Sequence, residues 1–119
     1  CINMAYKSKT KKIKEYIILD ILKGNLNYGD KLHDRKFFTS LFKVNPTYVD
    51  EVFMELLDEN LIENIDGSYY IKADEHHIMI LRDEYLNDYI NDFIDNLDTI
   101  DVSIDEAIRV LNIRNMANG

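Results

Sequence analysis

Apolar residues recur at spacings of three and four in the first part of the chain, which is the pattern of helices with one buried face. The first such stretch predicts a helix over residues 10–23, with Gly24 as its stop. Asp34 can cap a second helix that runs to residue 42. The lysines of the first helix should face water. The side chains expected in the core are Ile13, Ile17, Ile18, Ile21 and Leu22 of the first helix and Phe38, Leu41 and Phe42 of the second.

A third helix is predicted to begin at Asn45, because an Asn side chain can accept backbone N–H groups and Pro46 fits the first helical position. It ends near Asn60, a residue that tolerates the left-handed conformation found at helix ends. Only Lys43 and Val44 separate the second helix from this cap, and so short a connection fixes a steep angle between two helices. The pattern is that of a helix-turn-helix. The buried stripe of the third helix is Val49, Val52, Phe53, Leu56 and Leu57.

Two short runs of strand-forming residues follow, at 61–64 and 69–72. They are joined through Asp66 and Gly67, a strong signal for a tight hairpin turn. A further, very short strand is predicted at 31–32, before the second helix. A hairpin directly after a helix-turn-helix is a wing, so the first 72 residues predict a winged helix.

The rest of the chain predicts two amphipathic helices. The first spans 74–97, with Asp and Asn on its polar face. The second spans 104–114, because Ser103 and Glu106 form a capping-box pattern and Val102 can pack near Ala107; beyond it, fraying is expected. The apolar stripe of the longer helix is Ile78, Leu81, Tyr85, Leu86, Tyr89, Ile90, Phe93, Ile94 and Leu97.

These two helices present more apolar surface than a winged helix with its own core needs. A partner surface explains the stripe, and folding back onto the winged helix is the alternative. The predicted fold class is therefore mainly α with a small β-hairpin: a winged helix-turn-helix head, residues 7–72, followed by a two-helix C-terminal tail, residues 73–119.

Charge is divided unevenly along the chain, whose net charge is −8. Residues 1–36 hold nine basic and four acidic side chains, whereas residues 73–119 hold three basic and eleven acidic ones. A polyanion would be attracted to the first third and repelled by the last, so any nucleic-acid contact should be confined to one face. A solvated basic terminus is the alternative explanation of the N-terminal lysine cluster. That cluster is Lys7, Lys9, Lys11, Lys12 and Lys14.

Composition excludes several classes of protein. The chain has 119 residues, enough for one domain with a short appendage, and no apolar run of the length that spans a membrane. A lone cysteine, Cys1, and no apolar leader segment suggest a cytoplasmic protein. His76 and His77, with Asp74 and Glu75 beside them, suggest a metal site, but adjacent histidines point to different faces and no further His or Cys completes a ligand set. No nucleophile and base stand at a recognisable spacing, so we expect no metal, no cofactor and no enzyme activity.

Four motifs stand in register along the head: Gly29-Asp30-Lys31-Leu32, Val44-Asn45-Pro46-Thr47-Tyr48-Val49, Leu56-Leu57 and Glu59-Asn60-Leu61-Ile62. Together they resemble the GntR family. The resemblance covers residues 13–71, and the pair Asn45-Pro46 is similar to the YtrA-like branch, whose members carry a short two-helix tail.

The resemblance implies a homodimeric transcriptional repressor that binds a palindromic DNA operator, with the tail helices as the dimer interface and the third helix in the major groove. The tail stripe named above would then be the dimerisation surface. Whether a small-molecule effector exists is not determined by the sequence.

The same resemblance gives a set of DNA-binding candidates. For Asn45 a role as a pure helix cap is favoured, and for Tyr48 a half-buried aromatic is the alternative. Gly67 at the wing tip would allow close approach to the minor groove. The full set of candidates is Lys11, Lys12, Arg35, Lys36, Lys43, Asn45, Thr47, Tyr48 and Gly67.

The sequence also departs from the family pattern. Lys36 stands in place of a usual Arg and lacks its bidentate fork, and His33 stands in place of Pro. Asp50 replaces a frequent Arg on the third helix, with Glu51 beside it. Carboxylates near phosphates weaken binding, although Asp can accept a hydrogen bond from the cytosine amino group. The alternative function is therefore a winged-helix protein-interaction module that has lost DNA binding.

Overall fold

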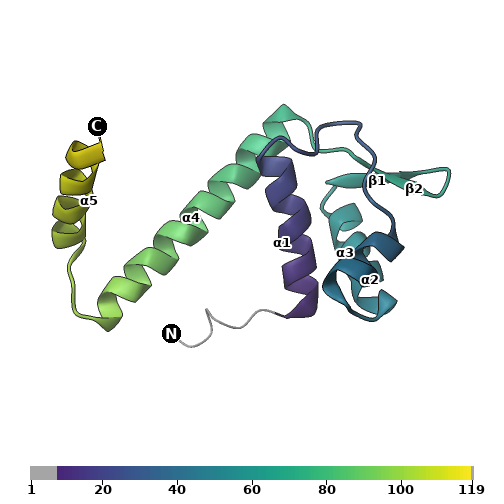
Figure 1. The fold of residues 1–119 in the computed structure, drawn as a ribbon. Coiled ribbons are helices and arrows are strands. Elements are labelled where there is room, and N and C mark those ends of the chain that lie inside the picture. Colours follow the sequence, from purple (N-terminus) through teal and green to yellow (C-terminus); the bar gives the residue numbers. More distant parts are fainter. Residues whose placement is uncertain (1–7, 119) are drawn as a thin grey trace. The chain divides into compact units, whose positions relative to one another are not determined.

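A computed structural model describes residues 8–118, and Figure 1 shows the order of the elements along the chain. These residues divide into two units, a head unit of residues 8–82 and a tail unit of residues 83–118. Lys7 and Cys1, which entered the sequence predictions, lie outside the described residues. The elements are α1 (Lys9–Leu22), α2 (Arg35–Phe42), α3 (Pro46–Asp58), β1 (Ile62–Ile65), β2 (Ser68–Ile71), α4 (Glu75–Thr99) and α5 (Ile104–Asn118).

The core of the head unit forms where α1, α2 and α3 meet. Phe38 of α2 is completely enclosed and makes edge-to-face contacts with Tyr16 of α1 and Phe53 of α3. Each such aromatic pair adds about 1 kcal/mol to what burial alone contributes. Apolar side chains of α1 and α3 close the core around this aromatic group; they are Ile13, Ile17, Ile18, Ile21, Val49, Val52 and Leu56.

The helix-turn-helix is confirmed, with its predicted caps. The Asp34 carboxylate accepts from the backbone N–H of Phe37 at 3.0 Å and starts α2. Lys43 ends α2 in the left-handed conformation (φ 53°), which turns the chain sharply toward α3. Asn60 adopts the same conformation (φ 59°) after α3, as its sequence position predicts.

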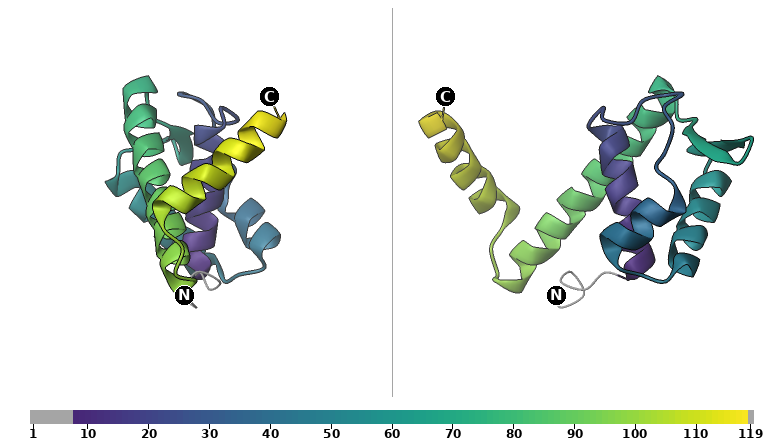
Figure 2. Two further views of the ribbon diagram at one scale, coloured as in Figure 1. Left: turned by 90° about the vertical axis from the view of Figure 1, so that its left-hand side faces the viewer. Right: turned by 45° about the vertical axis from the view of Figure 1, so that its right-hand side comes forward.

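The wing is a two-stranded antiparallel hairpin that projects from the three helices (Figures 1 and 2). Its turn residues Asp66 and Gly67 both have positive φ, 52° and 86°, as a two-residue hairpin turn requires. The short strand predicted at 31–32 is a single bridge from Lys31 to Tyr70. The head unit is therefore a winged helix-turn-helix.

The tail unit contains most of α4 and all of α5. The Ser103 hydroxyl accepts from the backbone N–H of Glu106 at 3.1 Å, which confirms the predicted cap. The prediction that the last helix frays after residue 114 is wrong, because α5 continues to Asn118. Residues 115–118 contain no Gly or Pro that would stop a helix.

One core prediction is also wrong. Leu41 is 48% exposed, because Phe38 takes the core-facing position of α2 and Phe42 packs edge-to-face on Tyr16. A helix of only eight residues has room for two such positions, and Leu41 falls on its flank. Along residues 8–118 there is no helix with the length and apolar character needed to cross a membrane.

Candidate nucleic-acid interface

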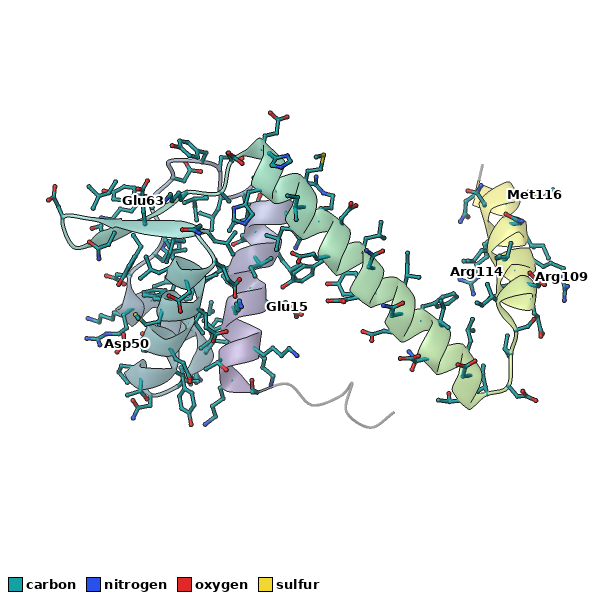
Figure 3. The ribbon with its side chains drawn as sticks, turned by 180° about the vertical axis from the view of Figure 1, so that it is seen from behind. Glu15, Asp50, Glu63, Arg109, Arg114 and Met116 are labelled. Atoms are coloured by element: carbon teal, nitrogen blue, oxygen red, sulfur yellow. The ribbon has the colours of Figure 1, made fainter. Side chains whose placement is uncertain are left out.

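The side of α3 that turns away from the core carries Thr47, Asp50, Glu51 and Met54, which we call the outward face. All four residues are exposed, whereas the opposite side of α3 is buried in the core. No residue of α3 is basic. Figure 3 shows Asp50 at the outer edge of the head unit. Any ligand of this face meets hydroxyl, thioether and carboxylate groups from α3 itself, and positive charge must come from neighbouring elements.

Asn45 caps α3, as the sequence predicts. Its side-chain oxygen accepts from the backbone N–H of Thr47 and from the Thr47 hydroxyl, both at 3.0 Å. Pro46 occupies the first turn, where a missing N–H leaves no unmet hydrogen bond. The oxygen of Asn45 and the hydroxyl proton of Thr47 are thus engaged with each other.

Tyr48 is half-buried and has a basic partner from another helix. The Lys9 ammonium lies 5.1 Å from the centre of the Tyr48 ring, within cation–π range. This contact brings the basic start of α1 beside the start of α3. Lys9 belongs to the predicted lysine cluster but was not among the DNA-binding candidates, since contact between the two helix starts depends on how the helices pack.

Arg35, the first residue of α2, forms an ion pair with Asp50 of the outward face. Its Nη1 atom donates to both carboxylate oxygens of Asp50, at 3.0 and 3.3 Å. Both side chains are more than half exposed, 57% for Arg35 and 51% for Asp50. The positive charge of Arg35 therefore lies beside the carboxylate of Asp50, the residue that departs from the family pattern.

The sequence predicts that Lys14 faces water, but the structure places its side chain in a mostly buried contact with acidic residues. Its ammonium contacts the carboxylates of Glu55 on α3, at 3.3 Å, and of Glu59, the residue that caps the end of α3, and its side chain is only 21% exposed. Burial alone would lower the pKa of Lys14, but the hydrogen bonds and charges of Glu59 and Glu55 outweigh it and raise the pKa above 10.5. Lys14 ties α1 to α3 because it lies on the side of α1 nearest α3, and it is not available to phosphate.

The other basic candidates are exposed on elements that flank α3. Lys11 and Lys12 lie on the first turn of α1, and Lys43 lies in the turn before α3. Lys36 lines an open depression of 890 Å³ on the outer side of α2. In that depression His33 stacks on Phe37 with ring centres 3.7 Å apart.

Gly67 at the wing tip lies near the Arg35–Asp50 pair. A cleft of 480 Å³ between the wing, α2 and α3 is lined by Gly67 together with Arg35 and Asp50. A Cβ added to Gly67 would meet no atom within 4 Å, so the positive φ is what favours glycine there. The wing turn, α3 and the Arg35–Asp50 pair therefore line one cleft.

The candidate dimerisation residues fall into two groups. Leu81, 7% exposed, lies in the head unit, where the neighbouring Arg82 donates to the backbone oxygen of Leu22 at 3.1 Å. In the tail unit, by contrast, the stripe on α4 is open: Tyr89 is 52% exposed and Phe93 42%. Of the other tail-unit members, Leu86 and Ile90 are exposed, and Tyr85, Ile94 and Leu97 are half-buried. Ile78, also half-buried, belongs with Leu81 to the head unit.

The shorter helix α5 adds apolar residues that the set of dimerisation candidates, drawn from the longer helix alone, left out. Between α4 and α5 lies a groove of 420 Å³ lined mainly by apolar side chains, with Arg114 at its edge. Figure 3 shows Arg114 on one side of α5 and Arg109 on the other. Apolar residues at 104, 108 and 111 lie on one side of the helix, which could have been read from their spacing of four and three. Of residues 83–118, Ala107 alone is buried.

No family model matches the sequence, and no curated protein matches it. Solved structures do. A GntR family transcriptional regulator from Listeria monocytogenes matches with a TM-score of 0.78 and 24% identity, over 89% of this chain and 94% of that one. YtrA from Sulfolobus acidocaldarius, a GntR-family transcription factor, is 31% identical over 66% of this chain and 83% of its own, with a TM-score of 0.52.

A third match has its DNA bound. BusR of S. agalactiae, solved in complex with its busAB-promotor DNA, matches with a TM-score of 0.54 and 21% identity, over 94% of this chain and 57% of BusR. At 21% identity the match supports an inference about the fold alone. It shows that a chain with this fold is found on promoter DNA.

Proposed function

Because the chain belongs to the GntR family of transcriptional regulators, in its YtrA-like branch, we propose that it is a homodimeric repressor that binds a palindromic DNA operator. Residues 7–72 would form the DNA-binding domain and residues 73–119 the dimerisation tail. The function is one of binding, in the cytoplasm, without a catalytic step.

The observation that carries the proposal is the contact between Lys9 and Tyr48. It sets the basic start of α1 beside the exposed start of α3, so positive charge lies next to the face that would enter a major groove. Lys11, Lys12, Lys36 and Lys43 would hold phosphates on either side, and Thr47 and Tyr48 would reach the bases or the backbone. Gly67 would bring the wing close to the minor groove.

The exposed apolar surface of the tail unit supports the proposal of a dimer. A unit of residues 83–118 in which only Ala107 is buried has almost no core of its own, although it exposes many large apolar side chains. Exposed apolar surface of this extent is typical of a subunit interface. The exposed large side chains of the tail unit are Leu86, Tyr89, Ile90, Phe93, Ile100, Ile104, Ile108, Val110, Leu111, Ile113 and Met116.

A second function is favoured by one observation. The outward face of α3 carries two carboxylates and no basic residue, and Glu51 has no basic partner within residues 8–118. A winged helix whose α3 presents carboxylates could bind a basic protein surface instead of DNA. The salt dependence of DNA binding distinguishes the two functions.

The proposed function predicts that replacing both Lys36 and Lys43 by alanine flattens the dependence of log affinity on log salt. The slope should fall by about 0.9 for each phosphate that the variant no longer neutralises, taken over both chains of the dimer. Fluorescence anisotropy with a labelled duplex across a salt series measures it.

Lys23→Ala is the control for charge removed away from the proposed contacts. Lys23 caps the far end of α1, about 20 Å along the helix from the end that contacts Tyr48, and its loss removes one positive charge per chain, against two in the double variant. The control should leave the slope near that of the wild type. Equal slopes for the wild type and the double variant would contradict the docking of α2 and the turn on the phosphate backbone.

A further inference from the structure

The Arg35–Asp50 pair joins the start of α2 to the outward face of α3. The Asp34 cap fixes where α2 begins, which makes Arg35 the first residue of that helix. From there its guanidinium reaches Asp50, fifteen residues further along the chain. Among the ion pairs of residues 8–118, this pair is the one that involves a residue of the outward face of α3.

The pair contributes little to stability. Both partners are more than half exposed, and an exposed ion pair of this kind contributes at most about 1 kcal/mol. What the pair does fix is the orientation of the Arg35 guanidinium. Both hydrogen bonds that Arg35 makes within the described residues come from Nη1, so the Nη2 and Nε hydrogens remain available to a ligand.

Two parallel N–H groups of a guanidinium match the O6 and N7 acceptors of guanine in the major groove. An arginine on a flexible stem must lose rotamer freedom to present them, and a carboxylate that already holds one edge reduces that loss. The cleft shared with Gly67 places the pair between α3 and the wing, on the side of the head unit where a duplex would lie.

We propose that Asp50 is a positioning residue, which holds the Arg35 guanidinium over the outward face of α3 so that Arg35 reads a guanine in each half of the operator. The inference rests on the proposed function. It also explains how this chain can read DNA with an acid at position 50, because Arg35 both neutralises that acid and uses it as a support.

Two alternative roles for the Asp50 carboxylate make different predictions. If Asp50 held Arg35 away from DNA, removing the carboxylate would strengthen binding and add a guanine preference. If Asp50 acted only as a negative charge near phosphates, removing it would strengthen binding to every sequence alike. Glu51, the adjacent carboxylate of the outward face, has no basic partner within residues 8–118 and serves as the reference for that second case.

The test is selection of a binding site from random-sequence duplexes by the wild type and by four variants of the full chain. Competition anisotropy on the selected site then measures discrimination at each base pair. The variants are Asp50→Asn, Asp50→Glu, Arg35→Lys and Glu51→Gln. Thermal unfolding followed by circular dichroism checks that each variant is folded, which the exposure of all three positions leads us to expect.

The proposal predicts that D50N and R35K lose discrimination at the same guanine of each half-site, by about fivefold or more, and keep it elsewhere. D50E, which retains a carboxylate, should keep part of that preference. E51Q should bind all sequences somewhat more tightly and leave every base preference unchanged.

The proposal is overturned if D50N behaves like E51Q, with a uniform gain and the guanine preference intact. It is equally overturned if D50N gains a preference that the wild type lacks. A wild type that selects no sequence at all contradicts the proposed function itself, and the inference falls with it.

Discussion

Asn45 stands at a position where an observed helix cap and a proposed DNA contact coincide. Its side-chain oxygen is fully used by Thr47, through the backbone N–H and the hydroxyl. A change at this position therefore alters the stability of α3 and the surface offered to DNA together, unless the substitution keeps the acceptor.

We predict that Asn45→Ala lowers the free energy of unfolding by about 1 kcal/mol, because the first turn of α3 loses its capping acceptor. Asn45→Asp keeps an acceptor at the same place and should unfold like the wild type, while its added negative charge weakens DNA binding. Urea denaturation and anisotropy measure the two effects. An alanine variant as stable as the wild type would show that the cap contributes nothing.

The lysines show why the sequence could not define the candidate site residue by residue. Lys11, Lys12 and Lys14 look alike in the sequence, yet Lys14 forms ion pairs with Glu55 of α3 and with Glu59, which caps that helix. The pairing of Arg35 with Asp50 is equally absent from the local pattern, because it depends on the angle between α2 and α3. Contacts of this kind arise from packing, which spacing along one helix does not determine.

At the scale of the elements, the sequence predicted the fold closely because local signals mark the boundaries. Asp34 and Asn45 start their helices through hydrogen bonds within three residues, and Asp66-Gly67 supplies the positive φ angles of the wing turn. The differences lie where such signals are absent. No residue stops α5 before Asn118, and Leu41 lies at the edge of a stripe in a helix of two turns.

For the tail unit, we predict that the exposed apolar stripe of α4 forms the dimer interface. Replacing Tyr89 and Ile90 by aspartate places two charges on the apolar face and should convert a dimer into a monomer, as measured by sedimentation equilibrium. Changing Asn87 and Asn91 to aspartate adds the same charge to the same helix on its polar face and should leave the dimer intact. A dimer that survives the first change would place the interface elsewhere, and a monomeric wild type would favour a tail folded back on the head.

At the scale of the whole molecule, charge and apolar surface are separated along the chain. The basic residues gather in the first 36 positions, whereas residues 73–119 carry eleven acids and the open apolar stripe. Such a division suits a protein in which one unit meets a polyanion and the other meets a second copy of itself. Two identical heads joined through their tails would read two half-sites related by a twofold axis.

The most direct test of this account is to select binding sites from random-sequence duplexes with the purified wild-type chain at low salt, and to titrate the best duplex by anisotropy across a salt series. The account predicts an enriched inverted repeat, bound by two chains, with an affinity that falls steeply as salt rises. Binding to the selected duplex no tighter than to a scrambled one would contradict it.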